Sequence, residues 1–349
     1  MSTHVAGYLL ICRIGAEMTR WRLLLDGAAR GAWNMAVDET LLLSLAQTGA
    51  PTLRFYDWQP SCLSLGRFQK WSETAHSRAA VSIDVDTSDA VPLGAASESK
   101  RDGAERDDED LPFDVVRRPT GGRAVWHQAE ITYCAVLRET DLPLESRSVA
   151  GAYRWLSGGF LDGLNTLGVH AALAAGKSND HDGDAQLLND GGVKRLGSMP
   201  QTPNCFSSAT RADFVVQGRK LIGAAQVRRD GVVLQHGSLL LDVDEESWQR
   251  AIGGSLRDVV SLRALGIETE KTRIIEALCA GCERALKADF AIGALSPIES
   301  DVAALLCRDK YERRSWNRQA RVESADQTRD LNHAVARLHA TCDGLKTTG

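Results

Sequence analysis

A glycine-rich turn at residues 117–127 restricts the fold of this chain more than any other segment. It reads Arg-Arg-Pro-Thr-Gly-Gly-Arg-Ala-Val-Trp-His and joins two apolar stretches, Val115–Arg118 and Ile131–Leu137, that we expect to be strands. Successive N–H groups in such a turn, with arginines beside them, suit an anion or a polarised carbonyl. Glycine pairs are also common in ordinary turns, so the pattern alone leaves a plain connection open. The turn is a candidate binding loop between two strands.

The other apolar patterns predict a chain with both strands and helices. Asn34–Gln47 carries apolar residues at helical spacing and acidic residues near its start, which predicts an amphipathic helix. Further helices are expected at Ser148–Leu167 and Thr272–Leu286, and helices should dominate after Ser247. Strands are expected at Trp21–Asp26, Thr52–Tyr56, Cys62–Leu65, Phe214–Val216, Leu221–Gln226 and Gly231–Leu241.

Two polar stretches, Ser82–Leu111 and Gly176–Asn204, show no sustained apolar spacing and are predicted to be insertions into loops. Residues 84–114 hold eleven acidic and three basic residues, so the net charge of −5 divides into −8 there and +3 elsewhere. The body of the protein is therefore mildly basic. We divide the chain into an N-terminal extension (1–20), a catalytic domain with both inserts (21–255), a helical segment packed on it (256–320) and a polar tail (321–349).

Length and composition are those of an ordinary globular protein. The 349 residues suffice for one large domain or two average ones. No run reaches the roughly 18 apolar residues of a membrane span, and Arg13 interrupts the short apolar stretch near the N-terminus. The eight cysteines lack the pattern of a secreted disulfide scaffold. We therefore expect a cytoplasmic protein with free thiols.

Cys279 and Cys282 form a C-x-x-C step within a predicted helix. A zinc site would need two more ligands, for which the downstream candidates are Cys307, His333, His339 and Cys342. Two cysteines packed one helical turn apart are the commoner outcome, so no metal is expected.

Cys205 and Lys220 are the candidate catalytic pair. Cys205 follows a polar stretch and precedes Phe206, and Lys220 enters an apolar strand, where an ammonium is costly unless it meets a partner. An ammonium near a thiol favours the thiolate, which is the form that a cysteine nucleophile requires. Spacing alone does not decide this, because Cys205 could be a packed small residue and Lys220 a solvated turn residue.

Six motifs in register resemble those of one enzyme superfamily. They are Asn34–Glu39; Leu53–Tyr56 with Ser64–Gln69; Arg117–His127; Cys205-Phe206; Gly218–Gln226; and Gln235–Leu240. The set, which spans about Trp21 to Trp316 without the inserts, is similar to the lipoate/biotin protein ligase superfamily. Within it, the chain looks most like the cysteine/lysine octanoyl-[acyl carrier protein]:protein octanoyltransferases first recognised in Gram-positive bacteria.

The resemblance implies an α+β fold with a mixed sheet flanked by helices, as in biotin and lipoate ligases. It implies Cys205 as the acyl-carrying nucleophile and Lys220 as the catalytic lysine. The substrate-binding residues that it implies are Arg67, Arg117, Arg118, Thr120, Gly121, Gly122, Arg123, Ala124, His127, Gly223, Ala224, Gln226 and Gly237. Two departures affect the hydrogen bonding behind His127, since Gln128 stands where relatives have Asp and Cys134 where they have Ser.

The implied reaction moves an octanoyl group from octanoyl-acyl carrier protein to Cys205, and then to a lysine of a lipoyl-type domain such as glycine-cleavage H protein. It needs no cofactor and no metal, and it involves neither nucleic acid nor membrane. Backbone N–H groups of the turn are candidates to stabilise the oxyanion.

Three other functions remain as alternatives. An ATP-dependent lipoate ligase would activate a free acid, but ligases usually have a third glycine at position 123 and an Asn-Asp pair in place of Cys-Phe. An amidotransferase would move octanoyl between lipoyl domains. A non-catalytic sensor would want an N-terminal helix-turn-helix, for which the residues before Trp21 are too few.

Overall fold

The computed structural model describes residues 18–71, 113–174, 213–253, 255–268, 270–321 and 332–338. Both predicted inserts, the Cys205-Phe206 step, and most of the predicted extension and tail lie outside these residues. The division of the chain into four parts therefore remains a prediction.

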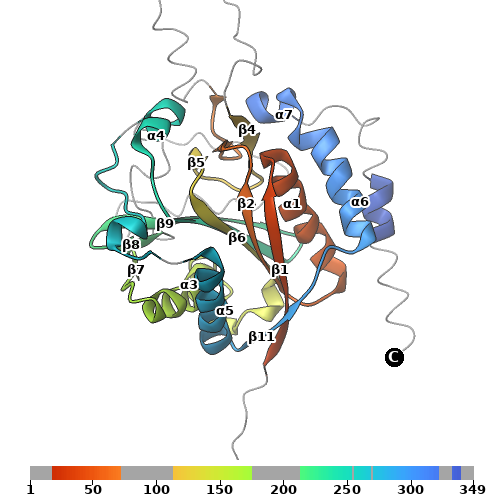
Figure 1. Ribbon diagram of the computed structural model, residues 1–349. Helices are drawn as coiled ribbons and strands as arrows, with labels where there is room; N and C mark the ends of the chain where they lie inside the picture. Colours follow the sequence, from red (N-terminus) through yellow and green to blue (C-terminus); the bar gives the residue numbers. More distant parts are fainter. Residues whose placement is uncertain are drawn as a thin grey trace, which may run out of the picture.

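A mixed sheet of eight strands forms the centre of the described structure (Figure 1). In spatial order its strands are β11 (Ala288–Ile292), β1 (Thr19–Ala29), β2 (Thr52–Trp58), β6 (Glu130–Arg138), β10 (Val232–Leu240), β9 (Arg219–Arg229), β8 (Phe214–Val216) and β7 (Ala172–Leu173). β1 runs parallel to both of its neighbours, and the other neighbouring pairs are antiparallel. Helix α1 (Gly31–Thr48) is the crossover that the parallel pair β1–β2 requires.

A second sheet of three strands carries the glycine-rich turn. β3 (Cys62–Leu65) pairs parallel with β4 (Asp114–Arg117) on one side and antiparallel with β5 (Val125–His127) on the other. The turn connects β4 to β5, so both of its ends are fixed to the same central strand. β5 was not predicted, because three residues are too few to show an alternating pattern.

Helices cover both faces of the large sheet. The helices are α3 (Val149–Thr166) and α5 (Lys271–Leu286) on one face, and α1, α6 (Pro297–Leu306), α7 (Arg314–Gln319) and a helix at 332–338 on the other. α4 (Glu245–Ala251) packs on the small sheet. The predicted helix at Asn34–Gln47 is present as α1, but it is buried on nearly all sides instead of being amphipathic. The cause is α6 and the helix at 332–338, which pack with it in one apolar cluster.

The C-terminal segment contains a strand among its helices that the sequence did not predict. Ala288–Ile292 forms β11, which pairs with β1 at the edge of the large sheet. Only Ala288 of this strand is fully buried, so its apolar pattern is weak. The other predicted strands and helices are confirmed, with ends shifted by a few residues. None of the described helices is both long enough and apolar enough to cross a membrane.

Glycines allow α3 and α5 to pack at close range. A Cβ atom on Gly281 of α5 would lie 2.3 Å from the carbonyl oxygen of Gly159 and 2.3 Å from the nitrogen of Gly163, both on α3. A Cβ on Gly163 would in turn lie 2.6 Å from the carbonyl oxygen of Ala277. These contacts are with backbone, which cannot move away independently. The close helix crossing therefore requires glycine, which has no side chain, at these positions.

Gly281→Ala is therefore expected to destabilise the fold by about 1–3 kcal/mol through overpacking. Gly158→Ala is the matched control, since a Cβ there meets nothing within 4 Å. It should stabilise α3 by about 0.5–1 kcal/mol, because alanine is the better helix former. Urea unfolding of both variants measures the two effects, and equal changes would show that the crossing is not glycine-dependent.

Candidate active site

Arg118 holds the glycine-rich turn from within. Its guanidinium donates to the carbonyl oxygen of Gly121 at 3.2 Å and to that of Arg123 at 2.8 Å. It also donates to the carbonyl oxygen of Ser64 at 2.9 Å and to the Ser64 hydroxyl at 2.7 Å. One buried side chain thus ties the turn to strand β3.

The inward position of these carbonyls fixes the direction of the opposite N–H groups. The backbone N–H of Arg67 donates to the carbonyl oxygen of Thr120 at 2.8 Å, and Arg118 takes that of Gly121. In a trans peptide unit the carbonyl and the following N–H point in opposite directions. The N–H groups of Gly121 and Gly122 therefore point away from the protein bonds that hold the turn, in the orientation needed for an external oxygen.

Glycine is required at two positions of this arrangement. A Cβ on Gly66 would overlap the carbonyl oxygen of Gly122, at 1.7 Å, and Gly122 has a φ of +92°. A Cβ on Gly121, by contrast, would meet nothing within 4 Å. The structure therefore explains Gly66 by packing and Gly122 by its left-handed backbone conformation, and Gly121 borders open space.

Arg117 links the turn to helix α7. It is 1% exposed, and its guanidinium donates to the carbonyl oxygens of Gly66, Gln69, Trp316 and Asn317 at 2.6–3.0 Å. Burial, with Arg67 and Arg118 nearby, lowers the pKa of Arg117 to about 10. These bonds hold main-chain segments together. A direct contact with substrate remains a prediction for Arg117 and Arg118.

His127 has partners on both ring nitrogens. Nε2 lies 2.6 Å from the Ser64 hydroxyl, Nδ1 lies 2.6 Å from Glu130, and the ring stacks on Trp58 at 3.9 Å between centroids. Gln128 instead accepts a hydrogen bond from Ser247 at 2.7 Å. Glu130 therefore orients His127. Gln128 and Cys134 are the two nearby positions at which this chain differs from its relatives.

Lys220 is buried in an ion pair with Asp213. The two side chains are each 1% exposed, and Nζ lies 2.8 Å from the Asp213 carboxylate. The backbone of Lys220 is held as well, by bonds to Asp258 and Val260. Lys220 is thus not a solvated turn residue. Asp213 was missed in the sequence, where the only signal was a single carboxylate directly before a short apolar strand.

Cys205 lies outside the described residues, but its distance along the chain is informative. Asp213 follows it by eight residues in the sequence. The N–H of Ala174 donates to the carbonyl oxygen of Asp213 at 2.9 Å. Ala174 and Asp213, which border residues 175–212 in the sequence, are therefore neighbours in the described structure.

Small residues lie at neighbouring positions of strands β9 and β10 and form a small-residue strip, whose β10 member Gly237 is buried. Gly223 and Ala224 are half-buried although β9 has neighbours on both sides, and Ala224 lies opposite Gly237 of β10. A Cβ on Gly237 would lie 2.7 Å from the ring of Tyr133. Gln226 bonds to Gln235 at 3.2 Å on the Tyr133 side. The predicted residues of these strands are brought together, whereas Ala124 packs in the core of the small sheet.

The described cysteines are poor nucleophiles. Burial raises the pKa of Cys62, Cys134 and Cys282 well above the usual thiol value. Burial and neighbouring carboxylates raise the pKa of Cys279 and of Cys307 to about 12. Of the described residues, none offers an activated thiol.

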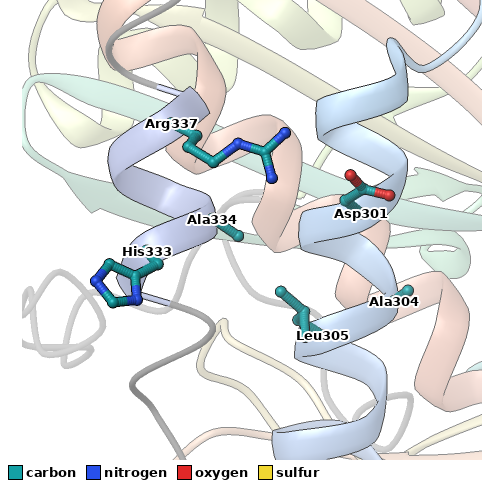
Figure 2. A pocket seen from close by; sticks show the side chains of 6 residues that line it. All are labelled: Asp301, Ala304, Leu305, His333, Ala334 and Arg337. Carbon is teal, nitrogen blue, oxygen red and sulfur yellow. The ribbon is translucent and has the colours of Figure 1, made fainter.

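A hollow of about 350 Å³ lies elsewhere, between α6 and the helix at 332–338 (Figure 2). Its lining comprises Asp301, Ala304, Leu305, His333, Ala334 and Arg337. It contains none of the predicted site residues. Among the described parts of the chain, no group of three or more His, Cys, Asp or Glu side chains is placed to hold a metal ion.

The chain is similar to proteins of lipoyl metabolism in sequence. A family model described as "Lipoyl protein ligase A/B catalytic domain" matches residues 30–278. Octanoyltransferase LipM of Kyrpidia tusciae is 36% identical over 314 residues, which cover 86% of this chain and 99% of that protein. Octanoyltransferase LipM of Clostridioides difficile is 30% identical over 315 residues, with 86% and 99% covered.

Solved structures share the fold. Lipoate-protein ligase A bound with ATP superposes with a TM-score of 0.62 at 19% identity and covers 86% of this chain and 99% of its own. A bi-partite lipoate protein ligase of Thermoplasma acidophilum gives 0.60 at 19% identity, with 88% and 99% covered. The predicted α+β fold of the lipoate ligase type is confirmed.

Native-state alkylation should separate the described thiols from an activated one. Each pKa unit above the working pH lowers the thiolate fraction about tenfold, so Cys62, Cys134 and Cys282 should resist iodoacetamide at pH 8. Peptide mass mapping before and after unfolding in urea measures this. Rapid labelling of Cys134 in the native protein would contradict the burial and pKa given above.

Proposed function

Because the chain belongs to the lipoyl protein ligase A/B catalytic domain family, we infer from its octanoyltransferase relatives that it transfers octanoyl groups in protein lipoylation. The observation that carries this is the group of relatives named Octanoyltransferase LipM, which are 30–36% identical over almost their whole length. The chain is accordingly an acyltransferase. The shared fold alone would not decide this, since ATP-bound ligases have it too.

We assign the nucleophile to Cys205. Its Cys-Phe step resembles that of the transferase branch, and the described cysteines have raised pKa values. The Cys205 thiolate attacks the octanoyl carbonyl carbon, and the C–S bond to the carrier protein breaks. The leaving carrier thiolate takes the proton that Cys205 gave up. The Lys220 ammonium, held in place by Asp213, favours the thiolate before attack.

The second step regenerates the thiol. The amine of the acceptor lysine attacks the octanoyl-Cys205 carbonyl, an amide bond forms, and the C–S bond to Cys205 breaks. The amine proton ends on the Cys205 sulfur, and the Lys220–Asp213 pair is the candidate relay for it. Thioester exchange is nearly thermoneutral and amide formation is downhill, so the sequence of steps consumes no ATP.

The glycine-rich turn is the candidate oxyanion site for both steps. Each tetrahedral intermediate places negative charge on the octanoyl carbonyl oxygen, and fixed N–H donors stabilise such charge. The outward N–H groups of Gly121 and Gly122 are the donors that Arg118 and Arg67 prepare. Gly223, which is half-buried and shares a face of the sheet with His236 and Ser238, is the candidate floor for the octanoyl chain.

A basic surface next to the turn suits an acidic carrier protein as donor. Residues 308–321 contain six basic and two acidic residues, and Arg314 and Arg321 are exposed. This segment touches the turn region, because Arg67 stacks on Trp316 at 4.2 Å and donates to the carbonyl oxygen of Ala320 at 3.3 Å. Opposite charges accelerate and orient encounter between proteins.

Transfer from octanoyl carrier protein to glycine-cleavage H protein should proceed without nucleotide. The mass of the acceptor reports the product. Cys205→Ser should lower the rate at least about 1,000-fold, as loss of a covalent nucleophile does. Cys134→Ala is the control and should remain active. Strict dependence on ATP plus free octanoate would indicate a ligase, and use of octanoylated lipoyl domain as the only donor would indicate an amidotransferase.

Reversal of charge in the basic segment should weaken use of the protein donor. Arg314→Glu with Arg321→Glu is expected to raise the KM for octanoyl carrier protein about tenfold or more at low salt, and much less at high salt. The rate with a small octanoyl thioester should change far less. Arg20→Glu is the control, because Arg20 is exposed on β1 away from the turn. An unchanged KM in the double variant would place the donor elsewhere.

A further inference from the structure

A buried histidine holds the threonine of the glycine-rich turn. Nε2 of His236, on β10, lies 2.6 Å from the hydroxyl oxygen of Thr120. Thr120 is 0% exposed and His236 is 5% exposed. His236 precedes Gly237, which lies opposite Ala224 on β9. The contact therefore joins the turn directly to the strand pair that carries the small-residue strip.

The other ring nitrogen of His236 is bonded to an aspartate of α1. Nδ1 lies 3.0 Å from Asp38, whose carboxylate also accepts from Arg54 at 2.8 Å and from the Tyr56 hydroxyl at 2.9 Å. Burial opposes ionisation of Asp38, but the bond from His236 and the charge of Arg54 outweigh it and hold its pKa below the usual value. An ionised Asp38 accepts only, so Nδ1 of His236 carries a proton.

The tautomer of His236 follows from these bonds. Burial, which outweighs the attraction of Asp38, lowers the pKa of His236, so the ring is neutral at neutral pH. Nε2 is then an acceptor, and the Thr120 hydroxyl donates to it. Arg54 fixes Asp38 further through its own second ion pair, to Asp26 at 2.6 Å. Donation thus runs from Thr120 through His236 to Asp38, and Arg54 donates to both Asp38 and Asp26.

The mechanism described above uses none of Asp38, Arg54 or His236. His127 forms a separate arrangement, because it bonds to Glu130 and to Ser64. The Ser64 hydroxyl also accepts a hydrogen bond from Arg118. Each end of the turn thus has its own buried histidine. Both contacts join the small sheet to the large one, His127 through Glu130 of β6 and His236 of β10 through Thr120.

We propose that Asp38 and His236 are positioning residues for octanoyl transfer, which act through the Thr120 hydroxyl to fix the turn against strand β10. The proposal rests on the proposed function. Misplacement of oxyanion donors by a fraction of an ångström lowers the rate without removing a substrate contact. The effect should therefore appear in kcat more than in KM.

Thr120→Val removes the hydroxyl at nearly constant volume and tests this directly. The kcat for octanoyl transfer should fall on the order of 10–100-fold, with KM for the carrier protein within about twofold. Thr120→Ser keeps the hydroxyl and should recover most of that loss. His236→Gln should lower kcat similarly, and Thr120→Val added to it should cost little more, since the two act as one unit. Additive losses would show that Thr120 acts on substrate by itself and would overturn the proposal.

Hydrogen exchange gives a readout that does not depend on activity. Peptides that cover residues 117–127 should exchange faster in Thr120→Val and His236→Gln than in wild type, while peptides of β6 and β10 should not change. Faster exchange throughout the sheet would mean a general loss of stability, and unchanged exchange in the turn would mean no positioning role; either result overturns the proposal. A wild-type protein with no transferase activity but the local exchange response would instead refute the proposed function.

Discussion

Main-chain carbonyls buried at the glycine-rich turn need hydrogen-bond donors, and two consecutive arginines supply them. A guanidinium offers five donors in one plane, so a single side chain can serve several carbonyls that a lysine could not. Arg118 donates to the carbonyl oxygens of Ser64, Gly121 and Arg123, and Arg117 donates to the loop that follows β3 and to helix α7. These bonds join the turn, the small sheet and helix α7 into one assembly.

The buried ion pair Lys220–Asp213 contributes to stability in a different way. Burying two charges costs several kcal/mol per ion before their attraction offsets it, so such pairs contribute little net stability. Removal of one partner destabilises the fold by about 3–5 kcal/mol, because it leaves an unpaired buried charge. Stability alone therefore does not explain a buried pair of this kind. The same fold carries ligases, so the side chains at such sites determine the reaction.

The sequence was sufficient for the local features of the site and insufficient for its long-range contacts. The turn and most strands could be predicted because residue spacing and glycine pairs report local backbone, whereas Lys220 was singled out by the resemblance of the motifs. The pairing of Asp38 with His236, 198 residues later, could not, because it depends on how α1 packs across the large sheet. Strand β11 escaped prediction for a related reason: it is held by pairing with β1, not by an apolar pattern of its own.

The central claim is that the octanoyl group passes through Cys205. The most direct measurement is rapid mixing of the protein with octanoyl carrier protein, acid quench, proteolysis and mass mapping of the octanoylated peptide. We predict an octanoyl thioester on the peptide that contains Cys205, formed before any acceptor is added and lost at the rate of overall transfer once acceptor is present. An octanoyl group on another residue, or an acceptor that is modified with no enzyme-bound octanoyl at any time, would contradict the account.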